Sequence, residues 1–363
     1  MATAQELPIN TGASALQMAL EIFGDSVTVV DADYRGDNSS SGIWTDGDAI
    51  APGVTPSDSG VLLSTGRLTS FTNASGDPNR SASTSSNTSG INNDGDFNAL
   101  AGRATYDASI LEVDFIPNSS SLSMQFTFAS EEYPEYVGSI FNDAVGIWIN
   151  GVEVASPVFS IADINSVNGG ANGTLYVDNT GDDYNTEMDG FTVTLNVIIP
   201  VNAGQVNTLK LGIADVGDSS YDSTLLVAGG SIQDDAIAAD DSGTVYTGYT
   251  LNLDVLANDT PGMFVTHVNG QPITTGGMVT LSSGHEIELL ADGRLGVTAP
   301  TVGPPAPENY NFSYTAESAT GISDSAFVTV TTIPCFTRGT RILTPSGEVH
   351  VEDLQIGQMV TTQ

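Results

Sequence analysis

Carboxylates gather in one stretch of the chain, FTFASEEYPEYVGSIFNDAVGIWING (126 to 151), between two strand-like apolar runs. Glu131, Glu132, Glu135 and Asp143 lie there without a lysine or arginine nearby. Carboxylates held close together without a cationic partner must repel one another, take up protons or bind a cation. The stretch therefore indicates a candidate cation site, with a solvated acidic loop as the alternative.

A second group of carboxylates follows later apolar runs. Asp189 precedes the run 191 to 199, and further aspartates crowd the turn after the run 209 to 213. Aspartate is common in turns for backbone reasons, so a structural role is the stronger interpretation of each one taken singly. Taken together they favour calcium, which prefers several oxygen ligands. We expect calcium held by a subset of residues that motif order brings to one edge of a sandwich: Glu131, Glu132, Asp143, Asp189, Asp215, Asp218 and Asp222.

Alternating side chains on both sides of the first acidic stretch predict the strands that position it. The apolar positions of these two half-buried strands are Met124, Phe126 and Phe128 before the stretch, and Val145, Ile147 and Ile149 after it. The connection between them carries Tyr133, Tyr136, Ile140 and Phe141. A connection this long that is rich in aromatic residues favours a packed, functional loop over disorder.

The remaining pattern predicts a mainly β chain with one helix. Residues 13 to 23 form the only convincing helix, with Leu16, Leu20 and Phe23 on its apolar face and Gly24 as its stop. From Val27 onward short apolar runs, Val158 to Ile164 among them, alternate with Gly, Ser, Asp and Asn clusters. This spacing predicts a large β-sandwich or jelly roll.

Residues 72 to 98 are almost purely Ser, Thr, Asn, Gly and Asp, which predicts a long surface loop unable to order itself. Within it, Asn92, Asp94 and Asp96 have the alternate-residue oxygen spacing of calcium loops but lack the terminal glutamate of an EF-hand. A solvated loop is the stronger interpretation of that triplet.

Composition restricts the class of protein. The 363 residues include 44 acidic and 8 basic side chains, which give a net charge of -36 at pH 7. This charge argues against nucleic acid and anionic membranes as partners. The abundance of Asp, Gly, Asn and Ser favours many turns between short strands, and an extracellular, cation-rich setting suits so acidic a chain.

No apolar run reaches the roughly 18 residues needed to cross a bilayer, so we expect no membrane insertion. The amino terminus MATAQELPINTG has neither a basic n-region nor an apolar h-region. We therefore expect an extracellular or cell-surface location without a cleaved N-terminal signal peptide. Cys335 is the single cysteine, which excludes an intrachain disulfide.

Several motifs in order carry a family resemblance: LLSTG (62 to 66), TYDASILEVDF (105 to 115), FASEEYPEYVGSIFNDAVGIWING (128 to 151), DNTG (178 to 181), MDGFTVTL (188 to 195) and IADVGDSSYDS (213 to 223). Across about residues 10 to 233 the chain resembles the bacterial choice-of-anchor L domain. The resemblance implies an exported or surface protein whose relatives carry different carboxyl-terminal anchoring segments. It implies no shared reaction.

Residues 234 to 240 form an acidic, alanine-rich linker, and ADDSGTVYTGYTLNLDVLANDTPG then opens a second unit. Over 241 to 332 this unit resembles the cadherin-like or Ig-like repeats of bacterial adhesins, which implies a small sandwich acting as a spacer. Asp254, Asn258 and Asp259 are either calcium ligands or, the stronger interpretation, a stabilised turn.

From Cys335 onward, CFTRGTRILTPSGEVHVEDLQIGQMVTT resembles the opening of a Hint domain, the self-processing fold of hedgehog proteins and inteins. The resemblance covers the incomplete start of that fold, 335 to 363, and implies that Cys335 is the nucleophile. Its thiolate would attack the carbonyl of Pro334 to form a thioester. A free buried thiol is the alternative, and no Thr-x-x-His motif follows before Gln363.

The sequence as a whole predicts an exported, calcium-stabilised, adhesin-like bacterial surface protein, with no enzymatic role for residues 1 to 334. Its partner would be a surface glycan or protein that the sequence does not identify. The alternative is autoproteolysis or protein splicing initiated at Cys335. Glycan hydrolysis needs a paired acid and nucleophile in a cleft, whereas Glu131 and Glu132 would face opposite sides of a strand.

Overall fold

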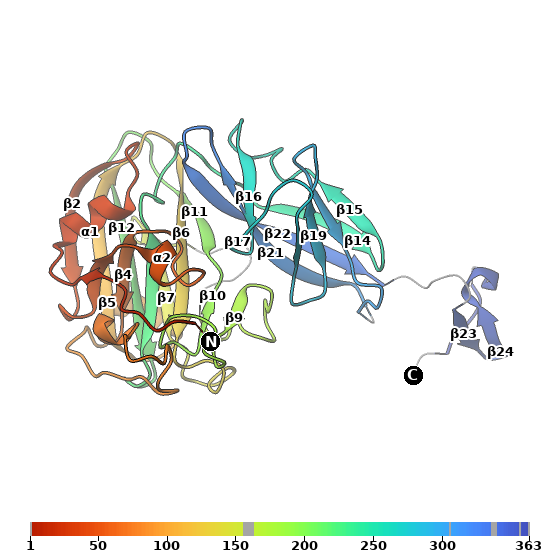
Figure 1. The fold of residues 1–363 in the computed structure, drawn as a ribbon, viewed down its shortest axis with the longest axis horizontal. Helices are drawn as coiled ribbons and strands as arrows, with labels where there is room; N and C mark the ends of the chain where they lie inside the picture. Colours follow the sequence, from red (N-terminus) through yellow and green to blue (C-terminus); the bar gives the residue numbers. More distant parts are fainter. Residues whose placement is uncertain (1, 155–162, 305, 335–339, 356, 362–363) are drawn as a thin grey trace.

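The computed structural model describes residues 2–154, 163–304, 306–334, 340–355 and 357–361. The described residues are mainly β-strand, as the sequence predicts, and form two sandwiches followed by a small hairpin (Figure 1). None of the helices in these ranges has the length and apolarity needed to cross a bilayer.

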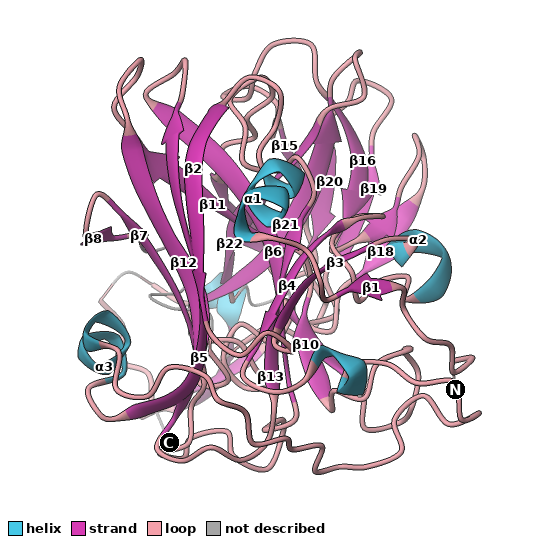
Figure 2. Ribbon diagram, turned by 90° about the vertical axis from the view of Figure 1, so that its left-hand side faces the viewer, coloured by secondary structure: helices cyan, strands magenta, loops and turns pink. Residues whose placement is uncertain are grey.

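The first domain is a sandwich of two sheets that face each other (Figure 2). The larger sheet runs in the order β1 (Ile9–Asn10), β3 (Ser41–Trp44), β4 (Gly60–Ser64), β13 (Ser223–Ala228), β6 (Ser121–Ser130), β10 (Gly190–Thr192) and β9 (Tyr176–Asp178), and β11 (Leu195–Pro200) also pairs with β6. The smaller sheet runs in the order β2 (Thr28–Arg35), β5 (Thr105–Ile116), β12 (Asn207–Val216), β7 (Ala144–Ile149) and β8 (Val152–Glu153).

Strands β6 and β7 flank the acidic stretch as predicted, but both of their faces are covered. The inner face of β6 lies in the core through Phe126 and Phe128. On the outer face of β7, the ring of Trp148 meets Phe97 of α3 (Gly95–Ala101) edge to face at 5.0 Å. The half-buried strands expected from the alternation are thus fully buried, because a helix absent from the prediction covers one of them.

The predicted amino-terminal helix is α1 (Ala15–Ile22), which begins at a capping box between Ser14 and Gln17. Its predicted apolar face is wrong at Leu16 and Leu20, which are 46% and 59% exposed, but correct at Phe23, which is buried in the core. The helix instead buries Met18, Ala19 and Ile22. Small Ala19 lets the helix approach the sheets closely, which leaves the two leucines on the outside.

Two further short helices lie outside the prediction of a single helix. They are α2 (Gly47–Ile50) and α3, and single 3₁₀ turns occur at Leu68–Ser70 and Val351–Asp353. Asp94 caps α3 by accepting hydrogen bonds from the backbone amides of Asp96 and Phe97. Capping aspartates of this kind start short helices even in polar sequence.

The polar stretch 72–98 is held in place, in contrast to the prediction that it could not order itself. Its side chains and backbone donate hydrogen bonds to carboxylates elsewhere in the first domain, for example from Ser86 to Asp222. The stretch gains its order from these polar contacts, which compensate for the absence of apolar side chains.

The loop after β6 is packed as expected. The Tyr133 side chain is fully buried and its hydroxyl donates to the carbonyl of Val167 at 2.5 Å. Tyr136 contacts Phe141 edge to face at 5.8 Å, while Ile140 remains exposed. The strand predicted at 158 to 164 falls mostly outside the described residues.

The second domain is a smaller sandwich, as expected for an Ig-like unit. One sheet has the order β14 (Asp241–Tyr246), β22 (Ser323–Ile333), β21 (Glu308–Glu317), β16 (Phe264–Val268) and β17 (Gln271–Pro272). The other has the order β15 (Thr250–Leu253), β20 (Leu295–Thr298), β19 (Glu286–Leu289) and β18 (Met278–Thr280). A hairpin of β23 (Arg341–Thr344) and β24 (Gly347–His350) follows.

The two domains share a joint. Phe327 of β22 is 1% exposed and belongs to the core of the first domain rather than that of its own. Next to it, the side-chain amide of Gln125 in β6 donates to the carbonyl of Ser323 at 3.0 Å and to Asp324 at 3.2 Å. The connecting segment is packed too, because Ala236 and Ala238 are buried in the second core.

Candidate metal centre

Strand register brings the first group of carboxylates together. Ser130, the last residue of β6, pairs with Gly190 at the start of β10 and with Ser223 at the start of β13. The strands are antiparallel, so the residue that follows β6 and the residues that precede β10 and β13 lie at the same end of the sheet. Those residues are Glu131, Asp189 and Asp222, and the Glu131 amide donates to the Asp222 carbonyl at 3.1 Å.

The smaller sheet ends at the same place. Ala144 of β7 pairs with Ala214 of β12, which sets Asp143 and Asp215 side by side. Asp143 Oδ1 accepts from the amide of Val216 at 2.9 Å, and Oδ2 accepts from the hydroxyl of Ser223 at 2.8 Å. Ser223 belongs to the larger sheet, so Asp143 links the ends of the two sheets.

Six of the predicted ligands lie out of contact with water. They are 1% to 4% exposed: Glu131, Glu132, Asp143, Asp189, Asp215 and Asp222. Burial raises the pKa of Glu131 to about 9, and the charge on Asp189 adds to the shift. Burial likewise raises the pKa of Asp143 to about 7 and that of Asp189 to about 6. Such shifts mean that the charged forms lack compensation.

The side-chain oxygens without partners point to what would compensate them. Every buried polar atom without a hydrogen-bond partner in the described residues is an oxygen, and these include both carboxylate oxygens of Glu131, Oδ2 of Asp189, Oδ1 of Asn79 and Oδ1 of Asp215. Thr84 lies close enough to lower the pKa of Glu131, yet neither Glu131 oxygen has a partner in hydrogen-bonding geometry. A buried acceptor without a donor costs about 1–3 kcal/mol. A cation or a proton would remove that cost.

Asn79 is a residue of this site that the sequence analysis missed. Its side-chain amide donates to Asp189 Oδ1 at 2.7 Å, which places its carbonyl oxygen among the acceptors that lack partners. The nearby DPN turn (77 to 79) marks a bend in the chain, but no spacing connects it to Asp189. Only the folded stretch 72–98 brings the two residues together.

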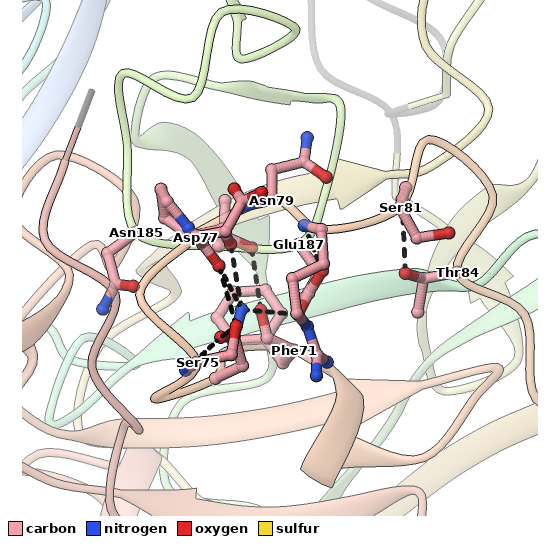
Figure 3. A network of polar contacts seen from close by, with 12 residues as sticks. Phe71, Ser75, Asp77, Asn79, Ser81, Thr84, Asn185 and Glu187 are labelled. Carbon is pink, nitrogen blue, oxygen red and sulfur yellow. Dashed lines mark hydrogen bonds and ion pairs between the residues drawn. The ribbon is translucent and has the colours of Figure 1, made fainter.

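Glu187 fastens this stretch beside the site (Figure 3). The carboxylate is 1% exposed and accepts from the side-chain amide of Asn73 at 2.6 Å. Arg80 adds its backbone amide at 2.9 Å and its Nε at 2.7 Å. Both carboxylate oxygens of Glu187 therefore have hydrogen-bond donors. By binding Asn73 and Arg80, Glu187 holds the segment that carries Asn79.

The structure divides the predicted ligand set. Glu131 and Asp189 lie in one group, and Glu132 lies with Asp143 and Asp215 in another, where the Asp143 amide donates to Glu132 Oε2 at 3.4 Å. Asp222 accepts two hydrogen bonds from Ser86.

Asp218, the remaining predicted ligand, is exposed and caps a turn through the amide of Ser220. In the described part of the chain no three Asp, Glu, His or Cys side chains converge as a metal-binding group. The group around Glu131 has only two carboxylates, and its further oxygen belongs to an amide, that of Asn79.

The weaker calcium candidates have other partners. Lys210 Nζ lies 2.7 Å from Asp94 and 2.6 Å from Asp96, in ion pairs that neutralise the polar triplet near residue 92. In the second domain, Asp259 accepts from the amide of Ala239 and from the hydroxyl of Tyr314. Asp94, Asp96 and Asp259 thus have structural partners. Cys335 lies outside the described residues.

Similarity to solved structures is slight. The chain is 13% identical to the immunoglobulin domains 1-4 of Sidekick-1, with a TM-score of 0.21, and the match covers 55% of this chain and 42% of that one. The chain is 8% identical to the M60 catalytic domain with two CBM51 domains of Clostridium perfringens ZmpB, with a TM-score of 0.16. That match covers 67% of this chain and 23% of the other. At these scores neither similarity supports an argument, and the chain spans less than half of either structure.

No curated protein matches the chain. Family models match three consecutive parts of it, in the predicted order. Residues 334–363 match a Hint domain, residues 233–331 a bacterial Ig domain and residues 9–233 the choice-of-anchor L domain. The last match spans most of the sequence and includes both groups of buried carboxylates, so the chain belongs to the choice-of-anchor L family.

Proposed function

We propose that this chain is a calcium-stabilised adhesive protein of the bacterial surface, without enzymatic activity in residues 1 to 334. The choice-of-anchor L and bacterial Ig domains indicate a bacterial surface protein. The excess of 44 acidic over 8 basic residues suits a compartment in which divalent cations are plentiful.

The observation that carries the calcium proposal is the set of buried oxygens around Glu131 that lack partners. Calcium takes about six to eight oxygen ligands and accepts bidentate carboxylates and amide carbonyls. Glu131 would supply both carboxylate oxygens, and Asp189 and Asn79 one oxygen each. Backbone carbonyls and water would complete the shell.

Glu131→Gln tests this assignment, because it removes the charge while keeping the shape of the side chain. In chelator the variant should be more stable than the wild type, because burial raises the pKa of Glu131 to about 9 and the wild type must take up a proton there on folding, which glutamine need not do. In millimolar calcium, the wild type should gain stability by mass action and the variant should gain far less. Calorimetric melting and isothermal titration with calcium measure both effects.

Glu153→Gln is the matched control, because Glu153 lies exposed in β8. It should leave both the chelator stability and the calcium gain unchanged. Equal melting temperatures of the wild type in chelator and in calcium, at constant ionic strength, would contradict the proposal. So would a Glu131→Gln variant that loses stability in chelator, since that result indicates a hydrogen-bonding role.

Adhesion is tested on the intact chain. Beads coated with the protein should attach to cell layers in calcium and detach when the calcium is chelated. Beads coated with the Glu131→Gln variant should respond less to calcium. Attachment no stronger than that of uncoated beads in calcium would remove the adhesive part of the proposal.

The alternative function is autoproteolysis or splicing that begins at Cys335, and the Hint match over residues 334–363 favours it. Residues 335 to 363 are too few to enclose the reaction, so this chain should stay intact in hydroxylamine or dithiothreitol. In a version extended through a complete Hint domain, a thioester formed at Cys335 would make the chain break between Pro334 and Cys335. Cys335→Ala should abolish the break. Mass spectrometry of the incubated chain distinguishes this activity from a passive role of the segment.

A further inference from the structure

A groove of about 1120 Å³ runs between the two domains. Its first wall carries the loop after α2 together with Tyr176 and Tyr184. Its second wall carries His267, the turn leading into β17 and Ser282 after β18. Asp48 of α2 and Thr280 of β18 both line the groove. The groove exceeds the roughly 300–1,000 Å³ of a pocket for one small molecule, so it suits an extended ligand.

Contacts between the domains hold the two walls in place. The side-chain amide of Asn311 donates to Asn172 at 2.8 Å, and that of Asn269 donates to the Thr174 carbonyl at 2.6 Å. Phe327 adds its buried ring to the joint. With these contacts formed, the groove needs little reorganisation to accept a ligand, which lowers the entropy cost of binding.

The charge of the groove excludes anions. Asp48, Asp58, Asp178 and Asp183 are exposed along it, and no lysine or arginine is among the described residues that line it. Burial lowers the pKa of His267, although Glu317 and Asp48 act in the opposite direction, so the imidazole is neutral at neutral pH. Phosphorylated, sulfated and sialylated ligands would meet only repulsion there.

Two tyrosine rings supply apolar faces on the first wall. The Tyr184 ring meets Phe191 edge to face at 5.0 Å, and the Tyr176 ring lies 4.9 Å from Tyr133. Both tyrosines are half-buried, so packing fixes the rings while part of each lines the groove. Gly53 lies against Tyr184, where an added Cβ would be 3.3 Å from the ring.

We propose that this groove binds an uncharged or amino-bearing oligosaccharide. A sugar ring has an apolar C–H face that packs on an aromatic ring, and a rim of hydroxyl groups that hydrogen-bond to carboxylates and amides. The groove offers both kinds of contact, and its carboxylates also suit the ammonium group of an amino sugar. A peptide would instead need a strand edge and a series of apolar pockets.

The inference deepens the adhesive role proposed above and rests on it. Isothermal titration of the intact chain in calcium should detect hexasaccharides of glucose, N-acetylglucosamine or glucosamine, and should detect neither oligogalacturonate nor sulfated oligosaccharides. Tyr184→Ala should weaken binding at least about tenfold, as expected for loss of an aromatic contact. Gln271→Ala removes an exposed side chain from the opposite wall and should weaken binding while leaving the fold intact.

Tyr249→Ala is the matched control, because Tyr249 is 64% exposed and lies outside the groove. It should bind like the wild type. Oligosaccharide binding that survives both Tyr184→Ala and Gln271→Ala would place the site elsewhere and overturn the inference. Coated beads that attach to cells although no oligosaccharide binds would overturn the inference alone. Failure of both assays would remove the adhesive role as well.

Discussion

Asn79 and Asp189 are 110 residues apart in the sequence and are joined by a 2.7 Å hydrogen bond from Asn79 Nδ2 to Asp189 Oδ1. The bond uses one carboxylate oxygen of Asp189 and the side-chain amide nitrogen of Asn79, which leaves one side-chain oxygen of each without a partner. The pair therefore presents acceptors alone to the space beside Glu131.

Asn79 should contribute to calcium affinity although it carries no charge. Asn79→Ala removes an oxygen ligand, and we expect calcium affinity to fall at least about tenfold. Asn79→Asp replaces the donor with a second carboxylate beside Asp189, so the variant should be less stable in chelator and gain more from calcium. Isothermal titration and melting in both media measure the two effects, and unchanged affinity in Asn79→Ala would exclude it as a ligand.

Lys210 should contribute far more to the free energy of unfolding than an ordinary surface lysine does. It is paired with Asp94 and Asp96 and lies 4.9 Å from the ring of Trp148. Lys210→Met keeps most of the side-chain volume but leaves buried Asp94 with only the longer ion pair to Arg35, at 3.5 Å. We therefore expect a loss of roughly 3 kcal/mol in the free energy of unfolding.

Arg294→Met is the control for Lys210, because the pair of Arg294 with Asp292 is exposed on both sides. Its loss should stay below about 1 kcal/mol. Urea unfolding measures both variants in saturating calcium. Equal small losses would mean that Lys210 acts as a surface residue.

Asp324 at the domain joint should make stability depend on pH. Burial raises the pKa of Asp324 to about 7, above its value in the unfolded chain. The stability contributed by this group is complete below the unfolded value of about 4. It falls as pH rises towards 7, by at most about 1.4 kcal/mol per pH unit.

Asp324→Asn should flatten this part of the pH dependence by about one proton between pH 4 and pH 7. Unfolding free energies measured across that range, in saturating calcium, compare the variant with the wild type. Parallel curves for the two proteins would show that the carboxyl group does not take up a proton on folding.

Phe327 should couple the unfolding of the two domains. Phe327→Ala leaves a cavity in the first core and should cost about 3–5 kcal/mol. Because the ring belongs to one domain and its surroundings to the other, the variant should also unfold in two separate calorimetric transitions. Phe264→Ala in the same sheet is the control, since Phe264 is 49% exposed and should change little. A single transition in Phe327→Ala would contradict the coupling.

The mainly β fold could be predicted from the sequence, because alternation and turn residues are local signals. The order of the domains could be predicted from the motifs that resemble known families. The buried face of α1 could not be predicted. Leu16 and Met18 are both apolar, and only the position of the sheets decides which of the two is buried. The burial of Trp148 on the outer face of β7 could not be predicted either, because it depends on Phe97 of α3, a helix that begins in polar sequence.

The candidate site could also be predicted only in part. Carboxylates that end strands were visible in sequence, and register explains why Glu131, Asp189 and Asp222 meet. The division of the set into two groups was not visible, because it depends on which sheet each strand joins. Asn79 was missed because its contact with Asp189 crosses 110 residues and has no periodic signal.

Strand β14 runs parallel to β22, with Asp241 opposite Val328 and Tyr246 opposite Ile333. The chain enters the second domain through one of these strands and leaves it through the other. Tension applied along the chain therefore draws the two strands in opposite directions along their common axis. The hydrogen bonds between them would resist as a group in shear instead of opening one after another from an end. The second domain is thus arranged to bear mechanical load that passes between the first domain and the residues that follow Ile333.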